Sequence, residues 1–488
     1  MPSKDSPWKT PIRQSNTASH NVKSTPPIFA KPTNAKGVAD LLRERADKFE
    51  TSTRNKWEKL TRTHASEWFK QSSNKELDER GSRASVLVKG LRRPDEDIAR
   101  TDLRGMAAVA KDYFFQLHTP ELLDQMREAA QDTLLEEVRL QGLLRPDPDP
   151  ENVIEGPFME EEMKSLLSRM PNTALGPDGI LYGFWRRLIK RLDNLQDVTP
   201  PPRTFWDVFS NLTADIAERG SSQEGFKNAN ISLFYKKGDP TLVSNYRPIS
   251  SMNTDCKMYT NLINARLAPW AVSKLHPDQK GFVPGRLMNE HTRLASEVSH
   301  LCDATDTPGF IVGLDQVKAY DRVDQFWLMK VLVAFGLPTS LILLISDLTS
   351  KCRLQVRING GYSPYLTLKR GVRQGDPLSC LLFNFSIEPL AIKLRERIVG
   401  LSVLGLAPVK IMLYADDINL FLGDRDHIPG ISSCLAEVSH AIGSKFNMDK
   451  TDIKPVGPHA FQLDCFTNQN MGDSVIPGAH ILPPADPL

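Results

Sequence analysis

Two adjacent aspartates, Asp416 and Asp417, stand in the middle of an apolar run that extends from Lys410 to Leu422. Apolar residues on both sides of the acids predict two short buried strands with a tight turn at the acids. Two carboxylates side by side in such a place repel each other and are costly to desolvate, and a divalent cation would relieve both penalties. For this segment alone, an ordinary hairpin turn is the alternative interpretation, because Asp-Asp is common in turns.

A third acid, Asp315, ends another β-rich run that begins at Gly309. Asp315, Asp416 and Asp417 together are the minimal set for holding two Mg²⁺ ions. Such a pair of ions clamps the attacking and leaving oxygens of a phosphoryl transfer. The spacing of the acids therefore predicts a metal-dependent nucleotidyl or phosphoryl transfer site.

The composition is that of an ordinary globular protein. The chain has 488 residues, of which 40% are hydrophobic and 25% are charged. The formal net charge is only +2, so a surface for nucleic acid must be local. The stretch 351–373 contains bases and no acid, and we expect a nucleic-acid track there, with a solvated hairpin face as the alternative. Its bases are Lys351, Arg353, Arg357, Lys369, Arg370 and Arg373.

Cysteine spacing and hydropathy exclude several classes of protein. The six cysteines include no Cys-x-x-Cys pair, which argues against a zinc knuckle and a disulfide framework and favours reduced thiols in an intracellular protein. No apolar run reaches the length of about eighteen residues that a membrane span needs. The polar N-terminus lacks the apolar core of a secretory signal.

Composition and periodicity divide the chain into four parts. We expect a disordered low-complexity tail at 1–36, a helical N-terminal extension at 37–155, alternating helices and strands at 156–455, and a Pro-rich tail at 456–488. The Pro-rich run 145–150 marks the second boundary. Strands are expected at 229–235, 311–314 and 352–358. Helices are expected at 159–169, 255–270, 325–335, 341–348, 378–398 and 432–445.

Six segments in a consistent order resemble reverse transcriptases. Tyr414-Ala-Asp-Asp417 resembles their active-site hairpin, 314–323 their strand-to-helix acid motif, and 370–379 their template and nucleotide loop. Three upstream segments, 174–180, 245–250 and 278–286, resemble those of retrotransposons without long terminal repeats, the LINE type. One short match would be weak evidence, whereas six ordered matches over 156–455 are strong evidence.

The resemblance implies an α+β fold with the fingers and palm of a right-hand polymerase, in which helices flank a ferredoxin-like palm sheet. It also implies an RNA-directed DNA polymerase that uses Mg²⁺ or Mn²⁺ to add dNTPs to a primer 3′-hydroxyl. The partners would be an RNA template and a DNA primer or target, and the location would be the nucleus or the cytoplasm. After Lys450 the family continues into a primer grip and a helical thumb, so we expect the thumb to be missing and the chain to be a truncated copy.

The resemblance also implies roles for individual residues. The catalytic residues would be Asp315, Asp416, Asp417 and Lys450, with Lys450 protonating the pyrophosphate. The metal ligands would be the three aspartates and the carbonyl of Gln316. Tyr320 would be a steric gate that rejects a ribose 2′-hydroxyl, with a core tyrosine as the alternative. The nucleotide would also contact Lys236, Lys237, Arg247, Gln374 and Gly375. The primer and template would contact Arg370, Arg373 and Tyr414.

Other functions stay open at this point. The missing thumb favours an inactive remnant that at most binds nucleic acid, whereas the intact acids favour an enzyme. An RNA-templated RNA polymerase would also use paired acids, but Tyr320 and Ala415 favour DNA synthesis by resemblance. A group II intron enzyme is a further rival, and the segments at Gly176 and Tyr246 favour the retrotransposon branch.

Overall fold

The computed structural model describes residues 87–120, 125–140, 156, 158–171, 176–193, 204–223, 225–423, 426, 428–447, 450–457 and 480–481. All of these belong to Lys70–Leu488, the second of two units into which the contacts divide the chain. The tail predicted at 1–36, the boundary at 145–150 and most of the tail predicted at 456–488 lie outside the described residues. The division of the chain into four parts therefore stays a prediction.

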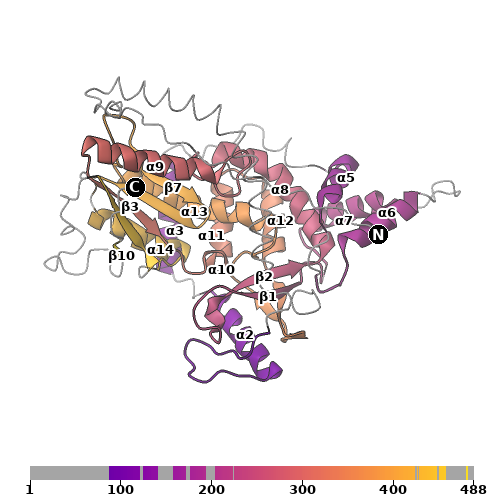
Figure 1. Cartoon of the computed structure of the whole chain (residues 1–488). Coiled ribbons are helices and arrows are strands. Elements are labelled where there is room, and N and C mark those ends of the chain that lie inside the picture. Colours follow the sequence, from indigo (N-terminus) through magenta and orange to yellow (C-terminus); the bar gives the residue numbers. More distant parts are fainter. Residues whose placement is uncertain are drawn as a thin grey trace, which may run out of the picture. The chain divides into compact units, whose positions relative to one another are not determined.

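The first sheet has the strand order β2-β1-β4-β5, with β6 paired to β4. Its strands β1 and β2 are labelled side by side in Figure 1. Strands β1 and β2 form an antiparallel hairpin, and β4 runs parallel to β1. The strands predicted at 229–235 and 352–358 are confirmed with the same bounds. The five strands are β1 Ala229–Tyr235, β2 Tyr246–Met252, β4 Cys352–Ile358, β5 Gly361–Tyr362 and β6 Leu366–Leu368.

The second sheet has the order β10-β9-β3-β8-β7. Strand β3 lies between β9 and β8 and is antiparallel to both, while β7 and β8 form the hairpin whose turn holds the paired aspartates. Two short strands with a tight turn at the acids are thus confirmed. The strands are β3 Gly309–Leu314, β7 Ile411–Tyr414, β8 Asp417–Leu422, β9 Asp452–Val456 and β10 His480–Ile481.

The predicted helices are confirmed, with shifts at their ends. Helix α8 continues past Pro269 to Lys274, although proline removes a backbone hydrogen bond, because Trp270 and Ala271 are buried. Helix α14 starts and ends earlier than predicted and stops before Gly443, whose φ is +71°. The helices of this region are α5 Glu160–Arg169, α6 Tyr182–Asp193, α7 Phe205–Arg219, α8 Thr254–Lys274, α9 Met288–Thr305, α10 Ala319–Arg322, α11 Gln325–Ala334, α12 Thr339–Thr349, α13 Ser379–Arg397 and α14 Ile428–Ile442.

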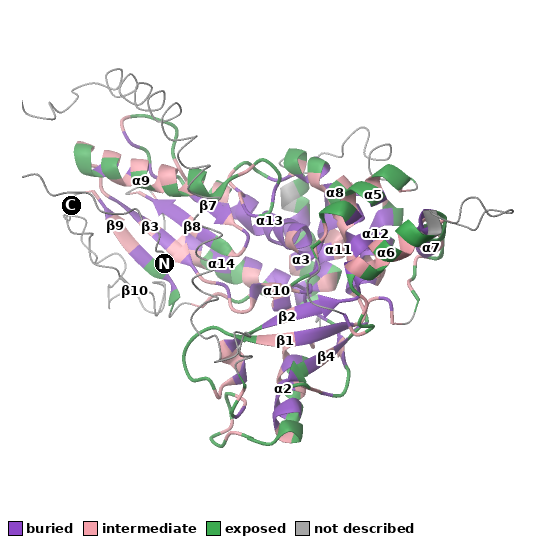
Figure 2. Cartoon of the chain, turned by 45° about the vertical axis from the view of Figure 1, so that its right-hand side comes forward, coloured by how far each residue is buried: buried purple, intermediate pink, exposed green. Residues whose placement is uncertain are grey.

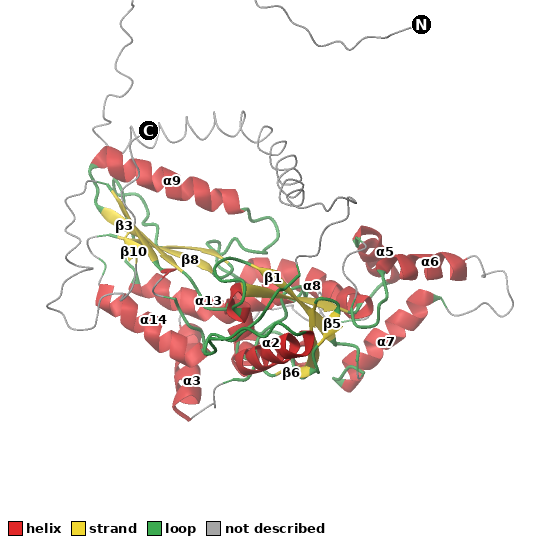
Figure 3. Cartoon of the chain, turned by 60° about the horizontal axis from the view of Figure 1, so that its bottom comes forward, coloured by secondary structure: helices red, strands yellow, loops and turns green. Residues whose placement is uncertain are grey.

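Helices cover both faces of the second sheet (Figure 3). On one face, Val298 and Cys302 of α9 pack on Met412 and Phe421 of the β7–β8 hairpin. On the other face, apolar residues of β3, β7 and β8 join the main core with α13 and α14. The strands and α13 are largely buried, whereas the outer face of α9 is exposed (Figure 2). The fold is α+β, as predicted, and no helix among the described residues is long and apolar enough to cross a membrane.

The N-terminal extension packs on this core through two helices, α2 Leu103–Leu117 and α3 Gln125–Leu140. Before α2, Val88 and Asn359 of the β4–β5 turn exchange two hydrogen bonds of 3.0 and 2.9 Å. On α3, Arg127 forms a 3.0 Å ion pair with Asp324, and both side chains are less than a tenth exposed. A buried charge left without its partner is costly, so this pair ties α3 firmly to the start of α11. The extension is therefore more than a spacer.

Candidate active site

The three predicted acids lie at one end of the second sheet. Asp315 directly follows β3, whose Leu314 pairs with Ile418 of β8. Asp416 lies in the β7–β8 turn, and Asp417 opens β8 opposite Tyr414. Burial raises the pKa of Asp416 and of Asp417, and the charge of Asp315 raises both further. The tertiary structure thus brings together acids that are a hundred residues apart in sequence.

The donor set suits a hard divalent cation, because it consists of carboxylate oxygens that repel one another without one. Within the described ranges, however, no group of three or more His, Cys, Asp or Glu side chains has the spacing of a metal site. The backbone next to Asp315 is fixed by the segment after α14: Asn447 donates to the Asp315 carbonyl, and Val317 donates to the Lys445 carbonyl. This antiparallel pattern turns the Gln316 carbonyl away from its partner Phe446.

Basic residues at the end of the β1–β2 hairpin face these acids. Lys236 and Arg247 are exposed, and their charges lower the pKa of Asp417, which offsets part of the rise that burial causes. Lys236 acts on Asp416 in the same way. Lys237 is exposed in the same turn. The aspartates of the β7–β8 turn therefore lie close enough to cationic side chains for those charges to shift the aspartate pKa values.

A second lysine group completes this surface. Lys450 is exposed, and burial followed by the charges of Lys236 and Lys450 lowers the pKa of Lys318. Lys318 donates through Nζ to the carbonyls of Ser244 and Tyr246, at 2.8 and 2.9 Å. Lys318 thus joins the turn after β3 to the β1–β2 hairpin.

Tyr320, the predicted gate, is held rigidly beside the acids. Its ring is stacked on that of Phe383 of α13, with centroids 4.7 Å apart and an interplanar angle of 8°. Burial raises the pKa of its hydroxyl well above the ordinary value, and the nearby Cys380 and Asp416 add to the shift. The side chain is half-buried rather than enclosed.

The loop before α13 carries Gln374 and Gly375. The Gln374 side chain donates through Nε2 to Asp321 at 3.2 Å. The main-chain carbonyl of Gln374 accepts the Ser250 N–H at 2.7 Å. Gly375 has a φ of +113°, and a Cβ at this position would lie 2.6 Å from the Ser250 carbonyl oxygen. Only glycine fits here without a shift of the backbone. The loop is thus fixed against β2.

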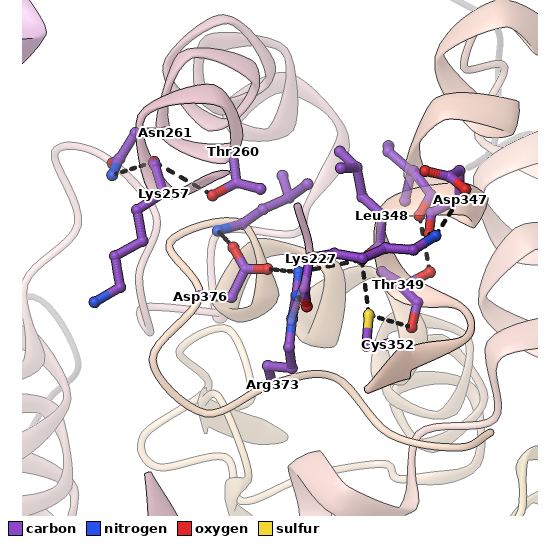
Figure 4. Close-up of polar contacts among 12 residues, drawn as sticks. Lys227, Lys257, Thr260, Asn261, Asp347, Leu348, Thr349, Cys352, Arg373 and Asp376 are labelled. Atoms are coloured by element: carbon purple, nitrogen blue, oxygen red, sulfur yellow. Dashed lines mark hydrogen bonds and ion pairs between the residues drawn. The ribbon is translucent and has the colours of Figure 1, made fainter. Parts of the chain in front are cut away.

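The prediction that Arg370 and Arg373 contact nucleic acid is wrong, because the structure buries both. They are 3% and 4% exposed. Arg370 donates to the carbonyls of Arg322 and Gly443. Arg373 donates to the Lys227 and Leu348 carbonyls and pairs with Asp376 (Figure 4). Their guanidinium groups satisfy buried backbone carbonyls, a role that charge counting in the sequence does not distinguish from surface binding. The other four bases of 351–373 are exposed.

Tyr414, assigned to the primer or template, is half-buried next to the acid turn. Its ring centroid lies 6.0 Å from that of Phe282, which is 53% exposed and has a φ of +56°. Sequence reasoning gave no role to Phe282, to its neighbour Gln279 or to Asp321. The segment 278–286 was noticed as a motif, but the contacts that explain it exist only in the folded chain.

Part of the chain is similar in sequence to known proteins. Residues 235–459 match the family model described as "Reverse transcriptase (RNA-dependent DNA polymerase)". The chain is 30% identical over 305 residues to "Transposon TX1 uncharacterized 149 kDa protein" from Xenopus laevis, a match that covers 61% of this chain and 22% of that protein. It is 29% identical over 299 residues to "Retrovirus-related Pol polyprotein from type-1 retrotransposable element R2" from Popillia japonica, covering 60% and 39% of the two chains.

The chain therefore spans well under half the length of these curated relatives. Among solved structures, apo telomerase from Candida tropicalis truncated from its C-terminal domain aligns at 14% identity, over 52% of this chain and 56% of that one. Its TM-score of 0.37 is too low to support an argument about the fold. The family match over 235–459, which includes the acid turn and the basic end of the β1–β2 hairpin, together with the transposon-borne relatives, supports a reverse transcriptase domain of a non-LTR element in this region.

Proposed function

We propose that the protein is an RNA-directed DNA polymerase that adds dNTPs to the 3′-hydroxyl of a DNA primer paired with an RNA template. One observation carries this proposal: Asp315, Asp416 and Asp417 share one end of a sheet, and the cations Lys236 and Arg247 face them closely enough to lower the pKa of Asp417. A triphosphate bound between acids and bases needs this combination of charges.

In terms of a right-hand polymerase, the second sheet with α13 and α14 corresponds to the palm. The first sheet, with its exposed β1–β2 hairpin, corresponds to the fingers. Topology supports this correspondence. The central strand β3 lies beside the β7–β8 hairpin, and this places all three acids at the same end of the sheet.

A divalent cation, Mg²⁺ or Mn²⁺, would be held by Asp315, Asp416, Asp417 and the Gln316 carbonyl. When bound, such a cation lowers the pKa of the primer hydroxyl and neutralises negative charge at the phosphates. The chain's own side chains bind the substrate, orient it or exclude part of it.

Lys236, Lys237 and Arg247 bind the triphosphate, and Arg247 suits this task because its guanidinium is planar and always charged. Gln374 and Gly375 lie against the sugar of the incoming nucleotide. Tyr320 excludes a 2′-hydroxyl by its fixed ring. Two further assignments complete the site: Lys450 donates a proton to the leaving pyrophosphate, and Tyr414 contacts the primer end. The protein would act inside the cell, in the nucleus or the cytoplasm, where its template RNA occurs.

Primer extension tests the proposal. The 488-residue chain is incubated with a labelled DNA primer on an RNA template, dNTPs and Mg²⁺, with Mn²⁺ in parallel. We expect primer extension that Asp416→Asn reduces by at least about a hundredfold. The reason is that the variant lacks a carboxylate that would hold the cation, and the cation would neutralise the charge that develops on the phosphate. Asp95→Asn, at an exposed acid on the loop before α2, is the matched control and should leave extension unchanged.

Two results would overturn the proposal. Extension that is equal in wild type and Asp416→Asn would remove the acid turn from the chemistry. Binding of primer–template without any extension would instead favour a protein that only binds nucleic acid.

A further inference from the structure

The segment Asp278–Arg286 runs directly against the turn that carries the paired aspartates. Lys280 donates to the Leu413 carbonyl at 2.8 Å, and Leu413 donates to the Asp278 carbonyl at 3.0 Å, so the segment adds a short parallel bridge to the edge of β7. A Cβ on Gly281 would lie 2.4 Å from the nitrogen of Ala415. Backbone touches backbone here, with no room for a side chain between them.

The segment is anchored firmly at both ends. Asp278 accepts two hydrogen bonds of 2.7 and 2.8 Å from Arg395 of α13. Arg286 donates to four carbonyls, those of Val272, Leu275, His276 and Gln279, at 2.6–2.9 Å. A segment held in this way can act as a fixed support for its neighbour.

Gln279 makes the contact that matters most for the turn. Its side chain is 0% exposed, and its Oε1 accepts the N–H of Ala415 and the N–H of Gly281, each at 2.9 Å. Both partners are donors, so the amide cannot be flipped without placing its Nε2 against two N–H groups. Ala415 has a φ of +53°, a conformation that costs free energy in a residue with a Cβ and persists only where the surroundings impose it.

The choice of an amide at this position also argues for a specific role. Among the described residues, Gln279 Nε2 is buried and has no hydrogen-bond partner. Burying such a group is unfavourable, so a position that only needed to fill space would be better served by an apolar residue. Glutamine makes sense here because its Oε1 is required by the turn.

We propose that Gln279 is a positioning residue: by accepting the Ala415 N–H, it holds Ala415 in the left-handed conformation and thereby sets the direction of Asp416. This inference rests on the proposed function, because it assigns Asp416 to the chemistry. Gln279 itself touches neither substrate nor metal. Its effect on the reaction passes through the backbone of the turn.

The test measures the turn directly and the reaction separately. Hydrogen–deuterium exchange of the peptide that covers 411–417 reports protection of the Ala415 N–H and requires no polymerisation. Gln279→Met keeps the volume but has no acceptor, and we expect exchange to be about tenfold faster, as for the loss of one buried hydrogen bond. Gln279→Asn moves the acceptor away by one methylene and should have the same effect if the Met variant does not fold.

Gln279→Glu should restore most of the protection, because a buried carboxyl takes up a proton and still offers a carbonyl acceptor. The matched control is Gln131→Met on α3. Gln131 is also 0% exposed, and its Nε2 donates to the Ala441 carbonyl at 2.9 Å, but it lies on a different element. This variant should leave exchange of 411–417 unchanged.

In primer extension, we expect Gln279→Met to lower kcat by about ten- to a hundredfold with an unchanged KM for dNTP, since supporting groups around catalytic ligands have effects of that size. Unchanged exchange of 411–417 in both loss variants would overturn the inference, as would a raised KM with normal kcat. A wild-type chain that does not extend primers would overturn the proposed function, and the exchange experiment would still decide whether Gln279 holds the turn.

Discussion

Among the single residues of the candidate site, several are held in one conformation by packing or hydrogen bonds. Tyr320 lies flat against Phe383, Gln374 is hydrogen-bonded to Asp321, and Gly375 is pressed against β2. Rigid placement of this kind is what lets a side chain discriminate between substrates by shape.

Replacing Tyr320 should change the choice of sugar. Because stacking on Phe383 fixes the ring, we expect Tyr320→Val to make room for a 2′-hydroxyl and to raise ribonucleotide use relative to deoxynucleotide use by about ten- to a hundredfold. The measurement is the ratio of kcat/KM for a ribonucleotide and its deoxy counterpart. Tyr320→Phe keeps the ring and should leave the ratio unchanged. If Tyr320→Val also leaves it unchanged, Tyr320 is an ordinary core residue.

The buried Asp321 should make stability depend on pH. Its side chain is 2% exposed, and burial raises the pKa of its carboxyl from 3.8 to about 7, against the opposing influence of Lys318 and Gln374. Tyr113 of α2 and His118, which directly follows that helix, also face this residue. The pKa of Asp321 is higher in the folded state than in the unfolded state, so the protonated carboxyl contributes to the free energy of unfolding. This contribution is fully present below pH 3.8 and is lost as the pH rises through about 7.

We therefore expect wild type to lose stability relative to Asp321→Asn between pH 4 and pH 7, by at most about 1.4 kcal/mol per pH unit. Urea unfolding at several pH values measures this difference. Burial lowers the pKa of His118 to about 4, which removes stability as the pH falls below 6.5, but this effect is common to both proteins and cancels. Parallel pH profiles would show that Asp321 is ionised without penalty.

At the scale of elements, the position of the β1–β2 hairpin decides whether its bases reach the acids. Two side chains hold the connection between β1 and β2. Lys318 donates to the carbonyls of Ser244 and Tyr246, and Arg92, from the segment before α2, pairs with Asp239 at 3.0 Å. The Arg92 main chain also accepts from Val243 and donates to Thr241. The pair of Arg92 with Asp239 is partly exposed and should matter less than the two bonds of Lys318.

Removing Lys318 should weaken nucleotide binding rather than chemistry. Hydrogen bonds from a charged group are typically worth about 1.5–3 kcal/mol, so we expect Lys318→Met to raise the KM for dNTP by about tenfold or more with little change in kcat. Arg92→Met should raise it less. Lys164→Met, at an exposed lysine of α5, serves as the control and should have no effect. A fall in kcat at constant KM would contradict the view that Lys318 positions the hairpin.

For the described part of the molecule as a whole, helices α2 and α3 share one core with the two sheets. Phe114 of α2 is 0% exposed and belongs to the same cluster of buried residues as β1, β4 and α13. The ion pair of Arg127 with Asp324 adds a buried polar link through α3. The described part of the extension should therefore unfold together with the two sheets.

Two neighbouring phenylalanines test this coupling. Phe114→Ala should lower the free energy of unfolding by about 3–5 kcal/mol, because it leaves a cavity in the shared core. Phe115→Ala, at a ring that is 43% exposed, should cost less than about 1 kcal/mol. Urea unfolding followed by tryptophan fluorescence should show one transition in both variants. A separate transition for Phe114→Ala would mean that the extension folds independently.

The local elements and the candidate acids can be recognised from the order of residues along the chain. Strand β4 was predicted to the residue because its alternation of apolar and polar side chains continues to both ends, and β1 because it runs into the basic turn that begins at Lys236. The β7–β8 hairpin was predicted from apolar runs on both sides of two acids. Order of motifs along the chain identified the family. These signals depend only on nearby residues or on the order of motifs, so they can be recognised without knowledge of the fold.

Which charged side chains are buried, and which backbone carbonyls they satisfy, depends on how the elements pack. Arg370 and Arg373 look like surface bases in sequence, yet they satisfy carbonyls from segments far away in the chain. Lys318 and Gln279 likewise act on Tyr246 and Ala415, partners more than seventy residues distant. A buried polar group must find a partner, but the partner is set by how elements pack, and no periodicity in the sequence records that packing.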